Sequence, residues 1–240
     1  MEKHKYRSIF ISDTHLGARY SNPDKLFSFL KSVECDYIFL VGDIFDFWAI
    51  KRNPSWNDHS NDVLRKFLKI AKKSKVYYLT GNHDEVVRKF TPTSFENIIV
   101  VDEFIHTLQN NKKVILVHGD IFDFVTGNLK WLAKIGSTIY DYLIILNRFI
   151  HWIQFHLGLP YWSISKFAKS KTKKALSHIK NFENLAIDYA KEKGCDLIIC
   201  GHIHTPKLSE CYANCGDWVE NFSYIVEEMD GTLKLLQYNH

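Results

Sequence analysis

The sequence lacks the features that mark several classes of protein. Its 240 residues contain no uninterrupted apolar run of about 18 residues, the length that a membrane-spanning helix requires. The five cysteines are odd in number and form no C-x-x-C pair, which argues against a zinc knuckle and against a secreted disulfide framework. The apolar stretch near the N-terminus is too short for a signal peptide. We therefore expect a cytoplasmic protein with reduced thiols that touches a membrane at most through its surface.

The chain also lacks a large excess of positive or negative charge. The chain has 31 Lys and Arg residues against 27 Asp and Glu residues, a net charge of +4 with its 12 histidines neutral. This small surplus slightly favours an anionic ligand and gives no reason to expect a stable nucleic-acid partner. With 46% apolar and 24% charged residues, the composition is that of a globular protein. We predict a single domain over residues 1–240.

Short apolar runs, rich in β-branched and aromatic residues, recur along the chain. They lie at residues 7–12, 36–41, 75–80, 97–101, 113–118 and 196–200. Their apolar residues are continuous rather than alternating, as in strands that are covered on both faces. Pro23 and the segment Ser60-Asn61-Asp62 signal helix starts, and Gly194 signals a helix end. The alternation predicts an α/β fold with largely parallel strands, followed after residue 212 by antiparallel strands with an Asp230-Gly231 turn.

One interval, residues 125–180 approximately, shows no strand signal and is rich in aromatic residues. We predict that it forms a helical cap inserted into the domain. Residues 139–157 are apolar on almost every side of a helix, and six lysines follow between residues 166 and 180. A subdomain core followed by a solvated face explains both features. The alternatives are that the apolar helix faces a partner subunit, a membrane or an apolar ligand, with the lysines at an anionic lipid surface.

Polar side chains directly follow five of the apolar runs. These candidate metal ligands are Asp13, His15, Asp43, Asn82, His118, His202 and His204, and His83 lies among them. In open α/β sheets, ligands gather at the carboxyl ends of the strands. Oxygen and imidazole donors without thiolates suit manganese, iron or zinc. Seven donors exceed the needs of one tetrahedral ion and suit two ions about 3.5–4 Å apart, which activate water for attack on phosphorus.

Simpler explanations hold for single motifs but not for the set. One histidine after a strand is more often packed or exposed than metal-bound, whereas five such motifs in order are specific.

The segment GDIFDF occurs twice, at 42–47 and 119–124, and we interpret the repeat as convergence rather than duplication. In the first copy Asp43 is the candidate ligand. At the second copy the candidate ligand is His118, directly before it, with Asp120 of the copy supporting His118. Asp46, Asp84 and Asp123 either orient ligands or cap helices.

The ordered motifs DTH (13–15), GDIFD (42–46), GNHD (81–84), HG (118–119) and GHIH (201–204) resemble those of calcineurin-like metallophosphoesterases. The resemblance implies a four-layer αββα sandwich of two mixed sheets and two divalent ions, Mn2+ first, with Fe or Zn as alternatives. It implies that one ion is held by Asp13, His15, Asp43 and His204, and the other by Asp43, Asn82, His118 and His202. His83 would be the catalytic residue that contacts the substrate or protonates the leaving group, and Asn82 and His202 would also contact substrate.

A narrower resemblance rests on GDIFDFW (42–48), the aromatic insertion and NCGDWVE (214–220). These segments resemble the UDP-2,3-diacylglucosamine diphosphatases, peripheral inner-membrane enzymes of lipid A assembly. The resemblance implies cleavage of that lipid to UMP and 2,3-diacylglucosamine 1-phosphate, with the insertion holding the acyl chains. The best-known branch has Arg where this chain has His83. A phosphodiesterase or pyrophosphatase acting on another nucleotide, lipid-linked diphosphate or nucleic acid is the alternative. A non-catalytic interaction module is a third reading, which the complete ligand set disfavours.

Overall fold

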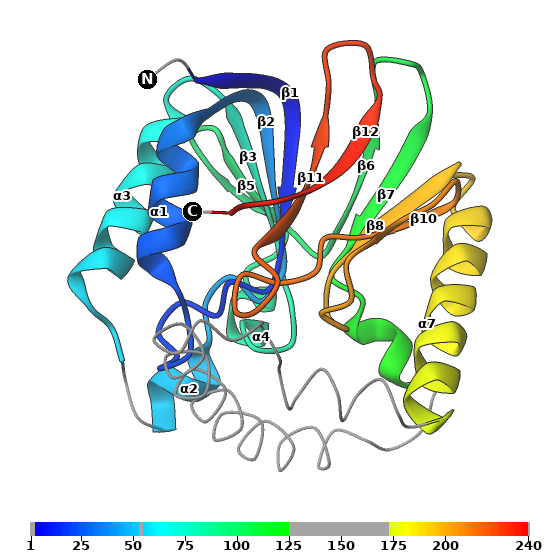
Figure 1. Ribbon diagram of the computed structural model, residues 1–240, viewed down its shortest axis with the longest axis horizontal. Coiled ribbons are helices and arrows are strands. Elements are labelled where there is room, and N and C mark those ends of the chain that lie inside the picture. The colour runs from blue at the N-terminus through cyan, green and yellow to red at the C-terminus, as the bar shows by residue number, and fades with distance from the viewer. Residues whose placement is uncertain (1–2, 53–54, 125–172, 240) are drawn as a thin grey trace, which may run out of the picture. The chain divides into compact units, whose positions relative to one another are not determined.

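The computed structural model describes residues 3–52, 55–124 and 173–239 (Figure 1). By its contacts the chain divides into two units, residues 1–120 with 186–240, and residues 121–185. Most of the predicted cap, residues 125–172, lies outside the described residues, so the single domain with an inserted cap stays a prediction. Among the described residues, no helix combines the length and the apolar character needed to cross a membrane.

A seven-stranded mixed sheet forms one half of the larger unit. Its strands run in the order β12 (Leu233–Gln237), β11 (Ser223–Glu227), β1 (His4–Ile11), β2 (Val33–Val41), β3 (Lys75–Leu79), β5 (Ile98–Val101) and β4 (Thr93–Phe95). β1, β2, β3 and β5 are parallel. The remaining three strands are antiparallel to their neighbours. The carboxyl ends of β1, β2 and β3 therefore meet at one edge.

A five-stranded mixed sheet forms the other half. It runs β6 (Glu103–Thr107), β7 (Lys113–Val117), β8 (Leu197–Cys200), β10 (Tyr212–Asn214) and β9 (Lys207–Leu208), with β8 parallel to both β7 and β10. The predicted antiparallel tail is thus divided between the sheets. β11 and β12 form the expected hairpin beside β1, whereas β10 joins the second sheet.

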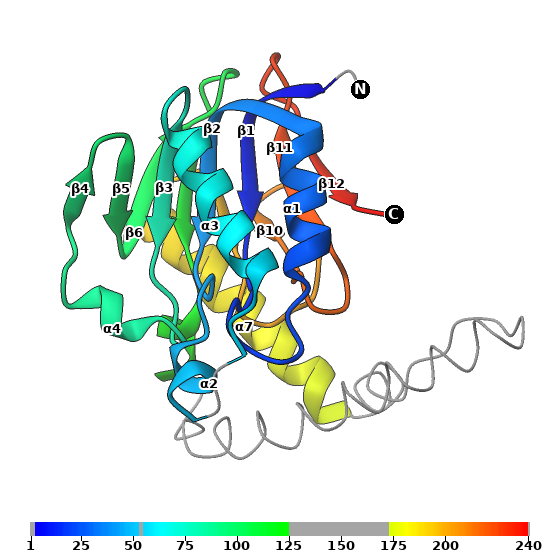
Figure 2. The ribbon, with the colours of Figure 1, turned by 90° about the vertical axis from the view of Figure 1, so that its left-hand side faces the viewer.

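Helices cover the outer faces of the sheets. α1 (Pro23–Ser32) and α3 (Asp58–Ala71) lie on the seven-stranded sheet (Figure 2), and each buries one stripe of side chains, such as Leu26, Phe29 and Leu30 of α1. The last turns of α7 (Lys173–Glu192) lie beside the five-stranded sheet (Figure 1) and bury Ala186 and Ala190. The order helix, sheet, sheet, helix confirms the predicted α/β sandwich of two mixed sheets.

Side chains of the central strands alternate between two cores. Ile9, Ile11 and Leu40 pack toward the helices, whereas Phe10 and Phe39 belong to the core between the two sheets. Both sets are fully or almost fully buried. This double burial explains why the strands are apolar at every position.

The repeated GDIFDF segments adopt different backbones. The first copy is irregular until α2 (Phe47–Arg52) begins at its last residue, while the second forms a short 3-10 helix over Asp120–Phe124. The first copy follows β2 in one sheet and the second follows β7 in the other. The same six letters therefore serve two different loops.

Candidate metal centre

All the predicted ligands lie on five loops, and each loop leaves the carboxyl end of a strand. Asp13 and His15 follow β1, Asp43 follows β2, Asn82 follows β3, His118 follows β7, and His202 and His204 follow β8. Backbone hydrogen bonds connect loops that leave neighbouring strands of the same sheet: the Gly201 N–H donates to His118 O at 3.0 Å, and the Asp13 N–H donates to Gly42 O at 3.1 Å.

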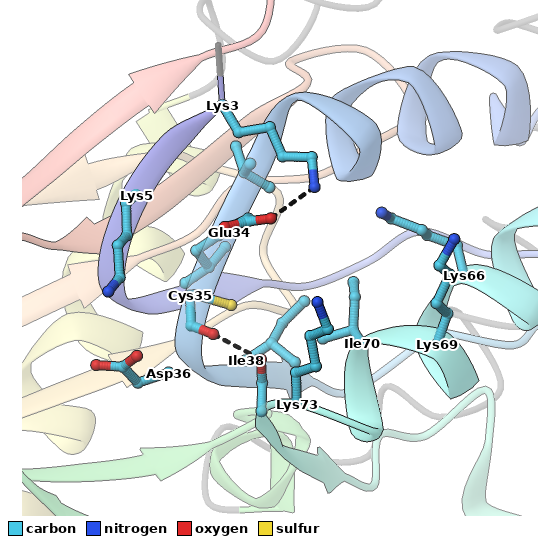
Figure 3. A pocket seen from close by; sticks show the side chains of 13 residues that line it. Lys3, Lys5, Glu34, Cys35, Asp36, Ile38, Lys66, Lys69, Ile70 and Lys73 are labelled. Carbon is cyan, nitrogen blue, oxygen red and sulfur yellow. Dashed lines mark hydrogen bonds and ion pairs between the residues drawn. The ribbon is translucent and has the colours of Figure 1, made fainter. Parts of the chain in front are cut away.

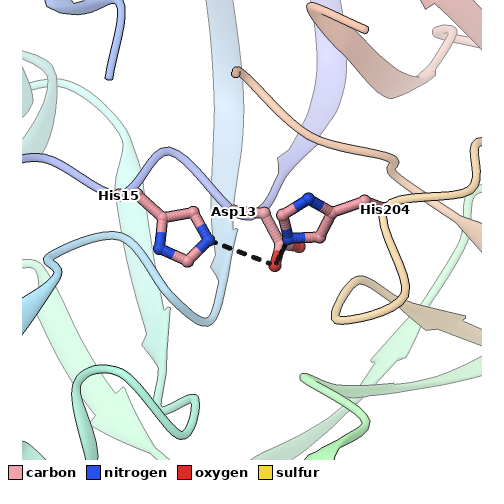
Figure 4. Close-up of side chains that lie close together, drawn as sticks. All are labelled: Asp13, His15 and His204. Atoms are coloured by element: carbon pink, nitrogen blue, oxygen red, sulfur yellow. Dashed lines mark ion pairs between the residues drawn. The ribbon is translucent and has the colours of Figure 1, made fainter. Parts of the chain in front are cut away.

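The first cluster consists of Asp13, His15 and His204, which Figure 4 shows turned toward one another. Asp13 Oδ1 lies 3.0 Å from His204 Nε2 and 3.8 Å from His15 Nε2. Asp13 and His15 are buried, and His204 is partly exposed. One carboxylate oxygen and two imidazole nitrogens thus face a common point.

Asp43 lies between this cluster and a second one. Its Oδ2 is 3.2 Å from His118 Nε2, and Asp13, Asp43 and His118 form one close group of donors while His15, Asp43 and His83 form another. The ring of His202 packs against that of His118, with centroids 5.1 Å apart. A carboxylate shared between neighbouring groups is what a bridging ligand requires.

Unpartnered polar atoms test whether the residues fit metal ions. Six buried side-chain nitrogen or oxygen atoms among the described residues have no hydrogen-bond partner, and four of them belong to predicted ligands: Asp13 Oδ1, His15 Nε2, Asn82 Oδ1 and His118 Nε2. An unsatisfied buried polar atom costs about 1–3 kcal/mol. Because cations would satisfy all four atoms, the residues fit a metal centre.

The charges of the cluster have the same implication. Burial opposes a positive charge on His15, yet the hydrogen bond to Asp46 and the charges of Asp43, Asp46 and Asp13 raise its pKa to about 9. Burial opposes the charge of Asp13 as well, but His204 and His118 lower its pKa to about 2. The buried carboxylates thus favour positive charge beside them, and a bound metal ion would supply that charge.

Five of the seven predicted ligands have left-handed backbone conformations. Their φ angles are 52° at Asp13, 47° at His15, 52° at Asp43, 69° at His202 and 51° at His204. Residues with a Cβ rarely adopt these angles, and each costs of order 1–3 kcal/mol. Hydrogen bonds hold them there, for example from the His15 N–H to Asp43 O at 3.0 Å and from the His202 N–H to Asp13 Oδ2 at 3.0 Å.

Two glycines let the loops approach one another. A Cβ on Gly42, whose φ is +78°, would overlap the ring of His118. A Cβ on Gly81 would overlap the Asp43 carboxylate and lie 2.6 Å from the Asp43 backbone nitrogen. In these two motifs, the glycine that precedes the polar residue is therefore required by the lack of space at the centre.

Asp46 contacts two histidines of the site. The sequence left open whether this residue orients ligands or caps a helix. Its Oδ2 lies 3.3 Å from His15 Nδ1 and accepts a hydrogen bond of 2.7 Å from Tyr20 Oη. Its Oδ1 lies 3.0 Å from His83 Nδ1, without hydrogen-bond alignment, and accepts from the Ala49 N–H at 2.7 Å. Asp46 therefore both orients site histidines and caps α2.

Asp84 is a second buried carboxylate near the centre. It accepts hydrogen bonds from the Ile44 N–H at 3.0 Å, the Gly81 N–H at 2.5 Å and Tyr78 Oη at 2.5 Å. Burial, followed by the nearby charge of Asp43, raises its pKa to about 6. Asp84 thereby ties the loop after β2 to the loop after β3.

The expectation that Asp120 supports His118 is wrong. His118 Nδ1 donates instead to the Val41 carbonyl at 3.0 Å. Asp120 accepts two hydrogen bonds of 3.1 Å from the guanidinium of Arg88, the last residue of α4 (Glu85–Arg88), which follows the loop after β3. Asp120 therefore joins two loops around the centre, and its charge only adds to those that raise the pKa of His118.

Two neighbours of the site were not identified from the sequence. The ring of Trp48 lies 4.2 Å from that of His83, tilted by 35°. Asp217 accepts from the Val219 N–H at 2.9 Å and the Glu220 N–H at 2.6 Å, and its Oδ2 is 4.0 Å from His204 Nδ1. Both residues lie in segments that carried the narrower resemblance, GDIFDFW and NCGDWVE, which was the available signal.

Curated relatives match over nearly the whole chain. A protein from Vibrio atlanticus named UDP-2,3-diacylglucosamine hydrolase is 26% identical, and the match covers 92% of this chain and 93% of the relative. A protein of the same name from Coxiella burnetii is 24% identical, with 95% and 96% covered. Among solved structures, a dimetal phosphatase from Danio rerio is 12% identical over 98% of this chain, with a TM-score of 0.44.

The sequence also matches the family model described as calcineurin-like phosphoesterase over residues 6–206. That range contains every predicted ligand and both sheets except β9, β10, β11, β12 and the first two residues of β1. The chain belongs to the calcineurin-like phosphoesterases and is a metal-dependent hydrolase of phosphoric esters or anhydrides.

Proposed function

We propose that the protein hydrolyses the diphosphate of UDP-2,3-diacylglucosamine to UMP and 2,3-diacylglucosamine 1-phosphate, a step of lipid A biosynthesis. Support for the substrate comes from relatives of that name that match over more than nine-tenths of both chains at 24–26% identity. Support for the chemistry comes from one observation above all: buried donor atoms without hydrogen-bond partners lie on three separate strand-end loops, and those of Asp13, His15 and His118 belong to close groups of donors.

In this proposal two Mn2+ ions occupy the centre, with Fe or Zn as alternatives. Asp13, His15, Asp43 and His204 would hold one ion, and Asp43, Asn82, His118 and His202 the other. When bound, the ions supply Lewis-acid stabilisation of the phosphate charge and an activated water. Asn82 and His202 would in addition contact the substrate phosphates.

His83 is the proposed catalytic residue. One face of its ring is covered by Trp48, and its Nδ1 lies near Asp46. Nε2 is therefore the nitrogen left to donate a proton to a phosphate oxygen or to the leaving group. The side chain is 13% exposed, so a substrate can reach it.

The substrate also sets the expected location of the enzyme. A diacylated sugar resides in a membrane, so we propose a cytoplasmic protein that contacts the anionic inner-membrane surface peripherally and has no stable nucleic-acid partner. The lysines and apolar residues that suggested this, between 139 and 180, fall largely outside the described residues.

The test uses Mn2+-loaded protein and measures its turnover of three substrates. They are UDP-2,3-diacylglucosamine, the same UDP-sugar without acyl chains, and bis-p-nitrophenyl phosphate. We expect UMP release from the acylated substrate to exceed release from the unacylated one by at least tenfold, and Asp43→Ala to abolish both. Hydrolysis of the simple diester without any turnover of the lipid would instead support the second candidate, a phosphodiesterase. That candidate is favoured by one residue, His83, where the best-known diphosphatase branch has Arg.

A further inference from the structure

A pocket lies at the end of the seven-stranded sheet where β1 and β2 begin, opposite to the end that carries the metal centre. It has a volume of about 260 Å³ and is lined by the first residues of β1, the start of β2 and the last turns of α3 (Figure 3). The metal centre follows the other ends of β1 and β2. Since a strand rises about 3.3 Å per residue, the eight residues of β1 alone separate the two sites by roughly 26 Å.

Positive charge gathers around this pocket. Five lysines line it, Lys3, Lys5, Lys66, Lys69 and Lys73, against two carboxylates, Glu34 and Asp36. Five minus two leaves a local surplus of three positive charges, compared with +4 for the whole chain. Figure 3 shows that Lys3, Lys66 and Lys73 reach from two different elements toward the same hollow.

Protein groups do not neutralise this charge. Lys3 pairs with Glu34 at 2.6 Å. Within the described part of the chain no ion pair holds Lys5, Lys66, Lys69 or Lys73, although Asp36 lies at the same pocket. The Ser74 hydroxyl, also at the pocket, donates to the Cys35 carbonyl at 2.6 Å and is not directed at a lysine.

Helix polarity explains part of the cluster but not all of it. Lys69 and Lys73 lie at the carboxyl end of α3, where positive charge stabilises a helix by roughly 0.3–1 kcal/mol. Lys66 lies a turn earlier, Lys5 belongs to β1, and Lys3 directly precedes β1. Burial, and then repulsion from Lys3 and Lys69, lowers the pKa of Lys66, so the lysines act on one another.

We propose that this pocket binds a phosphate-bearing anion at a site separate from the metal centre. A phosphate group accepts hydrogen bonds from several ammonium groups at once and would relieve their mutual repulsion. The pocket is a hollow between a sheet edge and a helix, which suits a small soluble phosphate compound. A phospholipid headgroup presents the same chemistry and is the other source of such a group.

Lysine labelling locates the ligand without relying on catalysis. Metal-loaded protein is treated with an amine-reactive ester in sodium phosphate or in sodium chloride at equal pH and ionic strength, and each lysine is followed by mass spectrometry. Phosphate should slow the labelling of Lys73 at least threefold and leave Lys72, which is exposed and does not line the pocket, unchanged.

A pair of double variants on the same helix provides the control. Lys66→Gln with Lys69→Gln removes two charges from the pocket and should abolish the protection of Lys73. Arg65→Gln with Lys72→Gln removes two charges from α3 outside the pocket and should preserve it. Both variants should keep wild-type turnover, because the metal centre is distant.

A further arm replaces phosphate with phosphatidylglycerol or phosphatidylcholine vesicles. Protection of Lys73 by inorganic phosphate identifies a soluble anion, whereas protection by phosphatidylglycerol vesicles alone identifies a headgroup; either result supports the site. Equal labelling of Lys73 under all conditions, or equal protection in the two double variants, would overturn it. Neither result bears on the lipid substrate proposed above.

Discussion

At the scale of single residues, the Asp46 carboxylate contacts two histidines of the candidate centre, one a predicted ligand and the other the predicted catalytic residue. One carboxylate lies beside His15 and His83, accepts from Tyr20, and caps α2 through Ala49. Histidines that bind metal depend on such partners to fix the ring orientation and the tautomer. We therefore assign Asp46 a positioning role for both the predicted ligand and the predicted catalytic residue.

Asp46→Asn should lower metal affinity or activity by about 10- to 100-fold, the usual effect of losing a carboxylate behind a ligand. Both the metal retained after dialysis and kcat should be measured. The contact of Asp46 with His15, a predicted ligand, predicts a loss of metal, and its contact with His83, the predicted catalytic residue, predicts a loss of kcat. Asp62→Asn, which changes a partly exposed carboxylate that is paired with Arg65 at 3.6 Å, is the matched control and should change neither. Wild-type values for Asp46→Asn would contradict the positioning role.

His83→Ala separates a catalytic role from a ligand role. We expect turnover to fall by roughly 10²- to 10⁴-fold, as for the loss of a general acid, with two ions per chain retained. The readouts are kcat and metal content by elemental analysis. Loss of metal from this variant would make His83 a ligand, which its closeness to His15 and Asp43 makes a real alternative.

The strand-end positions of the predicted ligands could be derived from the sequence, and the hydrogen-bond partners of these residues could not. Each predicted ligand directly follows a continuous apolar run, so local pattern was enough to place it at a strand end. The support of His118 is the Val41 carbonyl, and Asp120 belongs to Arg88, a residue 32 positions away. Such pairings depend on how loops from different strands meet, and no local signal encodes them.

At the scale of elements, the six predicted strand runs agree with β1, β2, β3, β5, β7 and β8 to within three residues at either end. The short strands β4 and β6 were not predicted, because half or more of their residues are exposed and their sequences lack a continuous apolar run. α3 begins at Asp58 rather than near Ser60, since the Asn57 side chain caps it by accepting from the Ser60 N–H at 2.9 Å.

The loop after β3 provides a test of how closely the strand ends approach. Gly81→Ala places a methyl group against the Asp43 carboxylate and backbone, so we expect loss of metal and of most activity. Gly194→Ala, where no atom lies within 4 Å of the added Cβ but φ is +68°, should cost only about 1 kcal/mol of stability and leave activity intact. Metal analysis and thermal unfolding distinguish the two effects. Normal metal content in Gly81→Ala would show that the loops are looser than described.

At the scale of the whole molecule, a buried polar cluster joins the two sheets far from the metal centre. Glu227 of β11 accepts from Ser8, lies 2.6 Å from Arg7 Nη1 of β1, and lies 3.2 Å from His106 Nε2 of β6. Burial opposes its charge, but His106, Ser8, the Gln109 N–H and Arg7 together lower its pKa to about 2. Glu227 thus holds a charge in the core because both sheets contribute partners.

This cluster predicts a pH dependence of stability. Since the pKa of Glu227 is lower in the folded chain (about 2) than its ordinary value of 4.5, its contribution is present above about pH 4.5 and lost as the pH falls toward 2. Glu227→Gln should lower the free energy of unfolding at neutral pH by about 1–3 kcal/mol. Urea titrations should show the gap between wild type and variant narrowing across that window. A gap that does not change with pH would mean that the charge of Glu227 contributes nothing.

The order of the ligands along the chain has a consequence for how the enzyme is made. The seven predicted ligands extend from Asp13 to His204, and the last two follow β8. A nascent chain that has emerged only through residue 200 carries five of them and lacks β11, the strand that pairs with β1 beside Asp13. Metal can therefore enter a complete centre only after nearly all of the polypeptide has left the ribosome, so maturation follows synthesis instead of accompanying it.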